Sequence, residues 1–320
     1  CLQWPCIGIR TSLEGFMTRA QHGIGSIDLD RRGFLGLVAA GSVTVMGALA
    51  GCGTGGSGSD ASASAAGTSK KALAGQHLTF VGDDAFAPYR YVQKTKSGKK
   101  KVVGLDIAIA DELARHLGFT YEFEAQEFSA TLASVQSSDT SFTMAMSSNK
   151  EREKTFDFTR GYYEPRVGVL TLGGKAVTSV DDLKGKSIAC TTGTVQNKFV
   201  EAVLPDGDIH TYDGGTQCLQ EVLAGRIDAY LCDGAEGQSM RDANKGLVLG
   251  LLDRKDTQDY VGVYRVMATK GATFVKAFDQ EIGKMLKDGT LDAHIKKYVG
   301  ADFAWGDDVS AAGTATEGVK

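Results

Sequence analysis

The sequence predicts an α/β protein of two lobes that are joined by two crossover hinge strands. From residue 78 onward, short apolar runs typical of strands alternate with segments of helical periodicity. Roughly 230 residues follow this pattern, which is large for one such sheet and comfortable for two. Two apolar strands, 167–172 and 261–268, bracket a self-contained block. The alternation predicts mostly parallel sheets with helices on both faces.

Local patterns predict the individual elements. Residues 78–82 (LTFVG) predict a strand. Residues 105–117 predict a helix, because every fourth residue is apolar and Gly118 is placed to end it. The remaining predictions, in chain order, are strands at 119–125 and 141–146 with a helix near 129–136 between them, a strand that enters a turn at 186–193, helices at 195–204 and near 219, strands at 227–233 and 260–270, and helices at 274–286 and 291–298.

Residues 1–51 are predicted to be a leader. Paired arginines at 31–32 precede the uncharged run 34–50, which is short for a membrane span, and this order is typical of an export signal. The pair resembles a twin-arginine signal, and LAGC, ending at Cys52, resembles the lipobox of bacterial lipoproteins. We therefore expect translation to start at Met17 and a lipid to be attached to Cys52. A plain anchor helix followed by an unmodified cysteine is the alternative.

Composition and the two apolar strands set the other boundaries. The Gly, Ser and Ala-rich residues 52–74 predict a flexible tether, and 307–320 a disordered tail. If both apolar strands cross between lobes, lobe 1 is discontinuous and comprises 75–166 and 268–306, and lobe 2 comprises 167–267. This arrangement predicts a hinge.

Charge and histidine content exclude several functions. The chain has 35 Lys and Arg against 39 Asp and Glu, which argues against a nucleic-acid partner. Its five histidines are scattered and no Cys-x-x-Cys occurs, so no metal site or cofactor is expected. Cys190, Cys218 and Cys232 are an odd number and cannot all pair within the chain. Buried free thiols are favoured over a bridge between Cys190 and Cys232.

Arg152 belongs to the first of three polar segments that follow predicted strands. Residues 148–151 (SNKE) fit a helix capping box, so Arg152 could be a surface charge paired with a neighbouring glutamate. Alternatively, it lies in the first turn of a helix whose free N–H groups attract an anion. There its planar guanidinium would bind a carboxylate through two hydrogen bonds. This segment alone fits both interpretations.

Two further segments occupy the same position after a strand. In CTTGTVQN, Gly193 permits a tight turn and Thr194 can cap the next helix. In IDAYLCDG, Asp233 follows an apolar strand, either as a turn residue or as a carboxylate that receives a cation. Ligands of open α/β sheets bind at the carboxyl ends of strands. Together the segments predict a site complementary to a zwitterion, with Arg152 facing its carboxylate.

Five motifs carry a resemblance to a known family. They are DDAFAPYRY, GLDIAIADELARHLG, MSSNKEREKTFDFTRGYY, LAGRIDAYLCD and MLKDGTLDAHIKKYVG, in this order. Residues 75–300 thereby resemble the polar amino acid-binding proteins of bacterial ABC importers, which have the type II periplasmic-binding fold. The run at 148–150 departs from the apolar-Thr-Pro sequence that is more usual there.

The resemblance implies how the two charged groups of an amino acid are held. Arg152 would bind the α-carboxylate together with the backbone N–H groups of Ser147 and Thr194. Asp233 would bind the α-ammonium together with the hydroxyl of Ser147 and the carbonyl of Ala145.

The resemblance also implies which residues surround the ligand side chain. Phe86 and Phe128 would lie on either side of it, although their residue types alone favour core positions. Asp83 and Gln196 would face its end. The acidic pair at 83–84 favours a neutral polar or cationic ligand, whereas Arg90 keeps an acidic ligand open.

The implied protein is a binding protein and not an enzyme. It would capture a polar amino acid by hinge closure at the extracytoplasmic face of the cell membrane, as a lipid-anchored monomer exported by the twin-arginine route, and deliver it to an ABC permease. One alternative is an exported cyclic-carboxylate dehydratase of the same fold, although no additional Glu or His suggests its general acid. Another is a ligand-sensing surface lipoprotein.

Overall fold

The computed structural model describes residues 71–300 and 303. The predicted leader with Cys52, most of the predicted tether and the predicted tail lie outside the described residues. Leu73, within the predicted tether, is buried and its N–H donates to the carbonyl of Leu117. No helix among the described residues is long and apolar enough to cross a bilayer.

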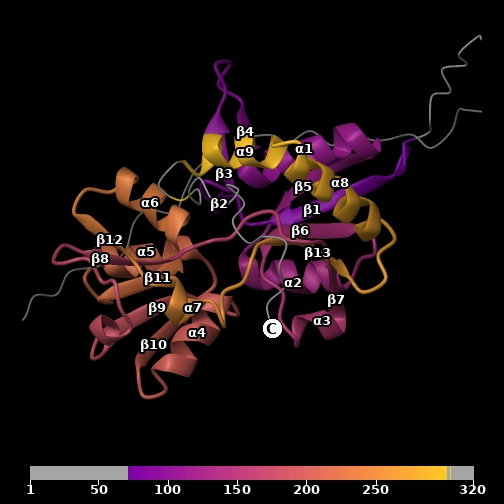
Figure 1. Ribbon diagram of the computed structural model, residues 1–320. Coiled ribbons are helices and arrows are strands. Elements are labelled where there is room, and N and C mark those ends of the chain that lie inside the picture. The colour runs from indigo at the N-terminus through magenta and orange to yellow at the C-terminus, as the bar shows by residue number, and fades with distance from the viewer. Residues whose placement is uncertain (1–70, 301–302, 304–320) are drawn as a thin grey trace, which may run out of the picture. The chain divides into compact units, whose positions relative to one another are not determined.

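Most strands belong to two five-stranded sheets, and we call each sheet with its helices a lobe (Figure 1). In lobe 1 the order is β5 (Thr120–Ala125), β1 (His77–Gly82), β6 (Ser141–Met146), β13 (Arg265–Thr269) and β7 (Phe156–Phe158). In lobe 2 it is β10 (Asp208–Tyr212), β9 (Ser187–Thr191), β11 (Ala229–Asp233), β8 (Val167–Leu172) and β12 (Leu247–Leu251). The mixed α/β class predicted from the alternation is confirmed.

Each sheet mixes strand directions. β5, β1 and β6 are parallel, whereas β13 is antiparallel to β6 and β7 to β13. Likewise β10, β9 and β11 are parallel, whereas β8 is antiparallel to β11 and β12 to β8. β7 and β12 therefore run in the same direction as the parallel strands, and the prediction of mostly parallel sheets misses one reversed strand in each sheet, β13 and β8. The chain enters β8 and β13 from the other lobe, so these strands run against their neighbours.

Helices cover both faces of each sheet. In lobe 1, α1 (Leu105–Leu117), α8 (Val275–Lys287) and α9 (Thr290–Tyr298) share one hydrophobic cluster, and α2 (Phe128–Gln136) belongs to another. In lobe 2, α4 (Val195–Val203) packs in one cluster, and α5 (Gly215–Leu223) and α6 (Gly234–Ala243) in another. The shorter elements are α3 (Arg152–Thr155), α7 (Arg254–Thr257), a 3-10 helix (Asp181–Leu183) and a hairpin sheet of β2 (Ala85–Phe86), β3 (Arg90–Lys94) and β4 (Lys100–Val103).

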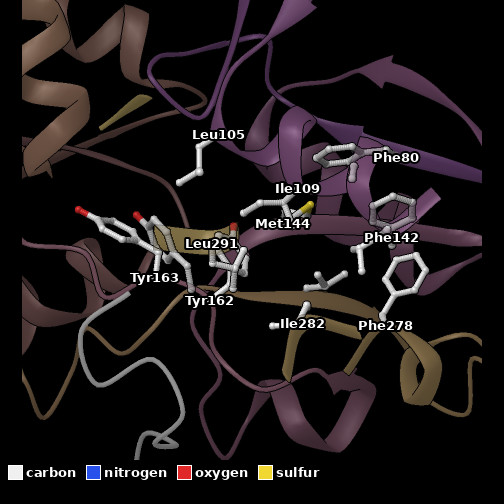
Figure 2. Packing of buried hydrophobic residues seen from close by; sticks show 14 of the residues in the cluster. Phe80, Leu105, Ile109, Phe142, Met144, Tyr162, Tyr163, Phe278, Ile282 and Leu291 are labelled. Atoms are coloured by element: carbon white, nitrogen blue, oxygen red, sulfur yellow. The ribbon is translucent and has the colours of Figure 1, made fainter. Parts of the chain in front are cut away.

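Aromatic packing fixes the core of lobe 1. The ring centroids of Phe80 and Phe142 lie 4.8 Å apart, and those of Phe142 and Phe278 lie 5.4 Å apart. Figure 2 shows these three rings together, with Tyr162 and Tyr163 at the other end of the cluster. The rings are fully buried, and such burial is the main favourable term in folding. This core supports the strands that end at the site.

The two segments that cross between the lobes lie side by side. Tyr163 and Tyr264 form an antiparallel bridge in which the N–H of Tyr264 donates to the carbonyl of Tyr163 at 2.7 Å. The strand predicted over 261–268 begins only at Arg265. Both crossings therefore run through paired irregular segments just before β8 and β13.

Candidate functional site

A cavity of about 650 Å³ is lined by residues of both lobes. Its wall includes segments that follow β1, β6, β9 and β11, the carboxyl ends of parallel strands. All nine residues that the sequence pointed to line it: Asp83, Phe86, Phe128, Ala145, Ser147, Arg152, Thr194, Gln196 and Asp233. The fold thus brings together residues that are up to 150 positions apart in the chain.

The start of α3 positions Arg152. The side-chain Oδ1 of Asn149 accepts hydrogen bonds from the N–H groups of Glu151 at 3.1 Å and Arg152 at 2.9 Å. The capping box at 148–151 is therefore wrong: Asn149 provides the cap, because its short amide reaches the N–H groups two and three residues ahead. Glu151 instead pairs with Lys198 of lobe 2 at 2.6 Å.

The guanidinium of Arg152 bridges the lobes through neutral partners. It donates to the carbonyl of Ser147 at 2.8 Å and to the carbonyl of Gly193, in lobe 2, at 3.0 Å. Burial lowers the pKa of Arg152 to about 10. A desolvated cation held by carbonyl groups is stabilised by an anion, and a guanidinium has five N–H donors. An anion in the cavity can therefore use the donors that remain.

The N-terminus of α4 is a second source of positive potential. The hydroxyl of Thr194 accepts from the N–H of Asn197 at 3.1 Å, so the predicted cap is confirmed. The N–H of Thr194 donates to the carbonyl of Thr191 at 3.3 Å within the turn. The next two N–H groups, of Val195 and Gln196, have no acceptor within the helix by its geometry. Both residues line the cavity, and Val195 was missed by the sequence analysis.

Asp233 is buried and caps α6. Its Oδ1 accepts hydrogen bonds from the N–H groups of Ala235 at 2.9 Å and Glu236 at 3.0 Å, and from the hydroxyl of Tyr89 at 2.9 Å. Its Oδ2 accepts from the hydroxyl of Tyr264 at 3.0 Å. Burial raises the pKa of Asp233 to about 6. Asp233 can therefore cap α6 and still bind a cation in the cavity, because its Oδ2 retains a lone pair for another donor.

Tyr89 and Tyr264 were missed by the sequence analysis. They lie 144 and 31 residues from Asp233, so no local pattern links them to it.

The last residues of β6 include an unusual backbone conformation. Ala145 has a φ of 58°, and its N–H donates to the hydroxyl of Tyr162 at 2.7 Å, which donates in turn to Asp106. A left-handed alanine is costly, and such residues cluster at functional sites. The hydroxyl of Ser147 donates to the carbonyl of Gly262 at 2.7 Å, so its oxygen remains an acceptor.

Arg90 lines the cavity but its charge is already compensated. It forms an ion pair with Asp106, a residue with no exposed surface, and donates to the carbonyls of Asp83 at 3.2 Å and Met144 at 3.3 Å. The suggestion that Arg90 could select an acidic ligand is therefore not supported.

The remaining residues of the predicted site are Phe86, Phe128, Asp83 and Gln196. Phe86 stacks on Tyr89 with ring centroids 4.7 Å apart and packs against the core of lobe 1, and Phe128 packs against the cluster around α2. Both rings are half-buried and line the cavity, so the core and cavity interpretations both apply. Burial raises the pKa of Asp83, while Gln196 is buried at the start of α4.

The cysteines of lobe 2 are free thiols, as favoured from the sequence. Cys190, Cys218 and Cys232 are buried, and burial raises the pKa of each thiol. No group of three or more potential metal ligands occurs among the described residues.

Known proteins resemble the chain in sequence. Residues 78–301 match the family described as bacterial extracellular solute-binding proteins, family 3. The L-cystine-binding protein TcyJ of Escherichia coli strain K12 is 28% identical over 205 residues, covering 63% of this chain and 76% of that protein. The histidine-binding periplasmic protein of the same strain is 26% identical over 248 residues, covering 75% of this chain and 94% of that protein.

Solved structures share the fold. An amino acid ABC transporter substrate-binding protein from Streptococcus pneumoniae, bound to L-arginine, superposes with a TM-score of 0.63 at 26% identity. The match covers 70% of this chain and 93% of that one. The fold is therefore that of the type II periplasmic-binding proteins, as the resemblance implied.

Proposed function

Because the chain belongs to the bacterial extracellular solute-binding proteins, family 3, a family of binding proteins and not of enzymes, we propose that its cavity captures a free amino acid for an ABC importer. One observation carries this proposal: Arg152 from lobe 1 and Asp233 from lobe 2 line the same cavity. A cation from one lobe and an anion from the other complement the carboxylate and ammonium groups of an amino acid.

The α-carboxylate would bind at the wall formed by Arg152 and the start of α4. The guanidinium offers charged donors, and the N–H groups of Val195 and Gln196 add the partial positive charge of a helix N-terminus. The backbone N–H groups of Ser147 and Thr194 remain predicted contacts.

The α-ammonium would bind at the wall formed by Asp233. Asp233 Oδ2, the hydroxyl oxygen of Ser147 and the carbonyl of Ala145 are its predicted acceptors. The side chain of the ligand would extend between Phe86 and Phe128, towards Asp83 and Gln196.

Ligand capture would use relative motion of the lobes. We propose the predicted boundaries, 75–166 with 268–306 for lobe 1 and 167–267 for lobe 2, with one adjustment: the start of β13 at Arg265 belongs to the sheet of lobe 1. The paired segments at Tyr163 and Tyr264 would form the hinge. Contacts that join the lobes beside the cavity include those of Arg152 with Gly193, Glu151 with Lys198, and Tyr89 with Asp233. A ligand bound to both walls would favour this closed arrangement.

The predicted leader is the basis of the proposed location. We propose twin-arginine export, a lipid on Cys52 and a monomer tethered beside the permease. Replacing Cys52 with alanine should release the protein from the membrane fraction.

A thermal-shift screen of the twenty amino acids tests the binding proposal. A ligand that binds only the folded state increases the free energy of unfolding by mass action, by about 2.7 kcal/mol when its concentration is 100 times Kd. The melting temperature rises accordingly. We expect at least one amino acid to raise it in the wild type. The shift should disappear in Arg152→Ala, which should still unfold cooperatively. The proposal fails if no amino acid changes the melting temperature of ligand-free protein.

A further inference from the structure

Glu236 is a buried carboxyl group in the cavity that the proposed contacts do not use. It lies in the first turn of α6, three residues after Asp233, and is 6% exposed. The hydroxyl of Tyr230 lies 3.3 Å from Oε1 and 3.4 Å from Oε2. Both distances are long for an O–H donor, and an ionised carboxylate has about four acceptor sites. The protein therefore satisfies this group only weakly.

Two glycines at the start of α5 lie near Glu236 and near Asp83, another acid of the cavity wall whose charge acts on Glu236. A methyl group placed on Gly215 would lie 2.4 Å from Oε1 of Glu236 and 2.7 Å from the hydroxyl oxygen of Tyr230. A methyl group on the preceding residue, Gly214, would lie 3.8 Å from Oδ2 of Asp83. Consecutive glycines therefore lie near the two acids, and a methyl group at 215 would displace the Glu236 carboxyl group from its position.

Burial and the charges of nearby acids disfavour ionisation of Glu236. Desolvation is the largest cause that raises its pKa well above the ordinary value, followed by Asp233 and Asp83. Two positively charged side chains are found among the described residues that line the cavity, Arg90 and Arg152. Arg90 is paired with Asp106, and Arg152 bonds to the carbonyls of Ser147 and Gly193. Neither arginine forms an ion pair with Glu236.

We propose that Glu236, with Asp83 and Tyr230 beside it, binds the positively charged end of the ligand side chain, so that the ligand is a cationic amino acid. This inference rests on the proposed function, in which Arg152 and Asp233 hold the α-groups. A guanidinium or ammonium group would supply the counter-charge that favours ionised Glu236 and Asp83, whereas a neutral side chain would supply none. The rings of Phe86 and Phe128 suit the aliphatic stem of such a side chain.

The ligand preference of the full chain, freed of bound amino acid, tests this inference directly. Calorimetry would compare L-arginine, L-lysine, L-glutamine and L-glutamate at pH 7.5. We expect arginine or lysine to bind at least about 10-fold more tightly than glutamine, since one hydrogen bond between charged groups is worth this much or more. If glutamine or glutamate binds as tightly as the cationic ligands, the inference is wrong and the proposed function stands. If none of the twenty amino acids binds, the proposed function itself fails.

The variant Glu236→Gln assigns the preference to one residue. It keeps the size and polarity of the side chain and removes its charge. We expect the affinity for the cationic ligand to fall about 10- to 100-fold, and that for glutamine to change much less.

Glu127→Gln is the matched control. The Oε2 of Glu127 lies 2.4 Å from a methyl group placed on Gly214, yet Glu127 is exposed and outside the cavity wall. The same change there should alter affinity less than about three-fold, because solvent screens exposed charges. Equal losses in both variants would show a general effect of negative charge and overturn the role of Glu236. The ligand comparison on the wild type decides the substrate class if Glu236→Gln does not fold.

Discussion

Arg90 and Arg152 line the same cavity but are compensated in opposite ways. Arg90 is buried against Asp106, whose other oxygen accepts from Tyr162, so its charge is used within lobe 1. Arg152 is half-buried and bonds to the carbonyls of Ser147 and Gly193. Position in the cavity wall therefore does not distinguish a structural arginine from a ligand-binding one. The partner distinguishes them: a carboxylate neutralises Arg90, whereas the carbonyls bonded to Arg152 leave its charge available to a ligand.

Removing Arg90 should cause the largest loss of stability. Arg90→Met leaves Asp106 buried without its counter-charge, and breaking a buried pair costs about 3–5 kcal/mol. We expect the free energy of unfolding, measured in urea, to fall by this amount. Arg226→Met, which breaks an exposed pair with Glu221, is the control and should change stability little. Equal effects of the two substitutions would contradict the structural role of Arg90.

Removing Arg152 should affect binding more than stability. Arg152→Ala leaves the ligand carboxylate without its cation, and we expect a loss of about 3–5 kcal/mol of binding free energy by calorimetry. The ligand-free protein should lose less, about 1–2 kcal/mol, because two hydrogen bonds to carbonyls disappear while the cost of desolvating the guanidinium is relieved. Arg152→Lys should recover part of the affinity, because a lysine keeps the charge but not the planar pair of donors. A stability loss as large as that of Arg90→Met would remove the contrast between the two arginines.

The raised pKa of Asp233 can be tested through the pH dependence of stability. The pKa of Asp233 is about 6 in the folded protein and has an ordinary value of 3.8, so between these pH values the folded state binds more protons than the unfolded state. The free energy of unfolding of the empty protein should therefore fall as pH rises from about 4 to 6, by about 3 kcal/mol from this group. Asp233→Asn should remove that part of the pH dependence. If the free energies of unfolding of the wild type and Asp233→Asn, measured in urea, change equally with pH across this range, the assignment to Asp233 is contradicted.

Breaking the exposed ion pair between the lobes should have the smallest effect on ligand binding. Glu151 and Lys198 form an ion pair at 2.6 Å whose side chains are 75% and 45% exposed, so solvent and salt screen it. Lys198→Met should weaken ligand binding less than about two-fold, and 0.5 M salt should abolish even that difference. A larger, salt-independent loss would mean that this pair helps to hold the lobes closed.

Elements with strong periodicity were predictable from the sequence. The helix at Leu105–Leu117 and the strand at Val167–Leu172 agree with their predictions, because each buries a regular apolar pattern. The helix Gly234–Ala243 was missed, since its sequence GAEGQSMRDA contains two glycines and no apolar stripe. The strand Leu247–Leu251 was also missed, although the apolar run LVLGL could have revealed it.

The site was predictable where family motifs carry it and unpredictable where distant contacts do. Arg152 and Asp233 were found because each follows a strand within a recognised segment. Tyr89 reaches Asp233 across 144 residues, and no pattern in the chain encodes that contact. Glu236 could have been noticed as an acid three residues after Asp233, but its proximity to Asp83 required the three-dimensional structure.

A ligand and variant cycle tests the central claim, that Arg152 holds the ligand α-carboxylate, most directly. Calorimetry would measure the amino acid that binds and its α-carboxamide, each with the wild type and with Arg152→Ala. The carboxamide keeps every other group, so we expect it to bind the wild type about 100-fold more weakly and to lose little further affinity in the variant. If Arg152→Ala weakens the carboxamide as much as the acid, the guanidinium does not contact the carboxylate and the account is wrong.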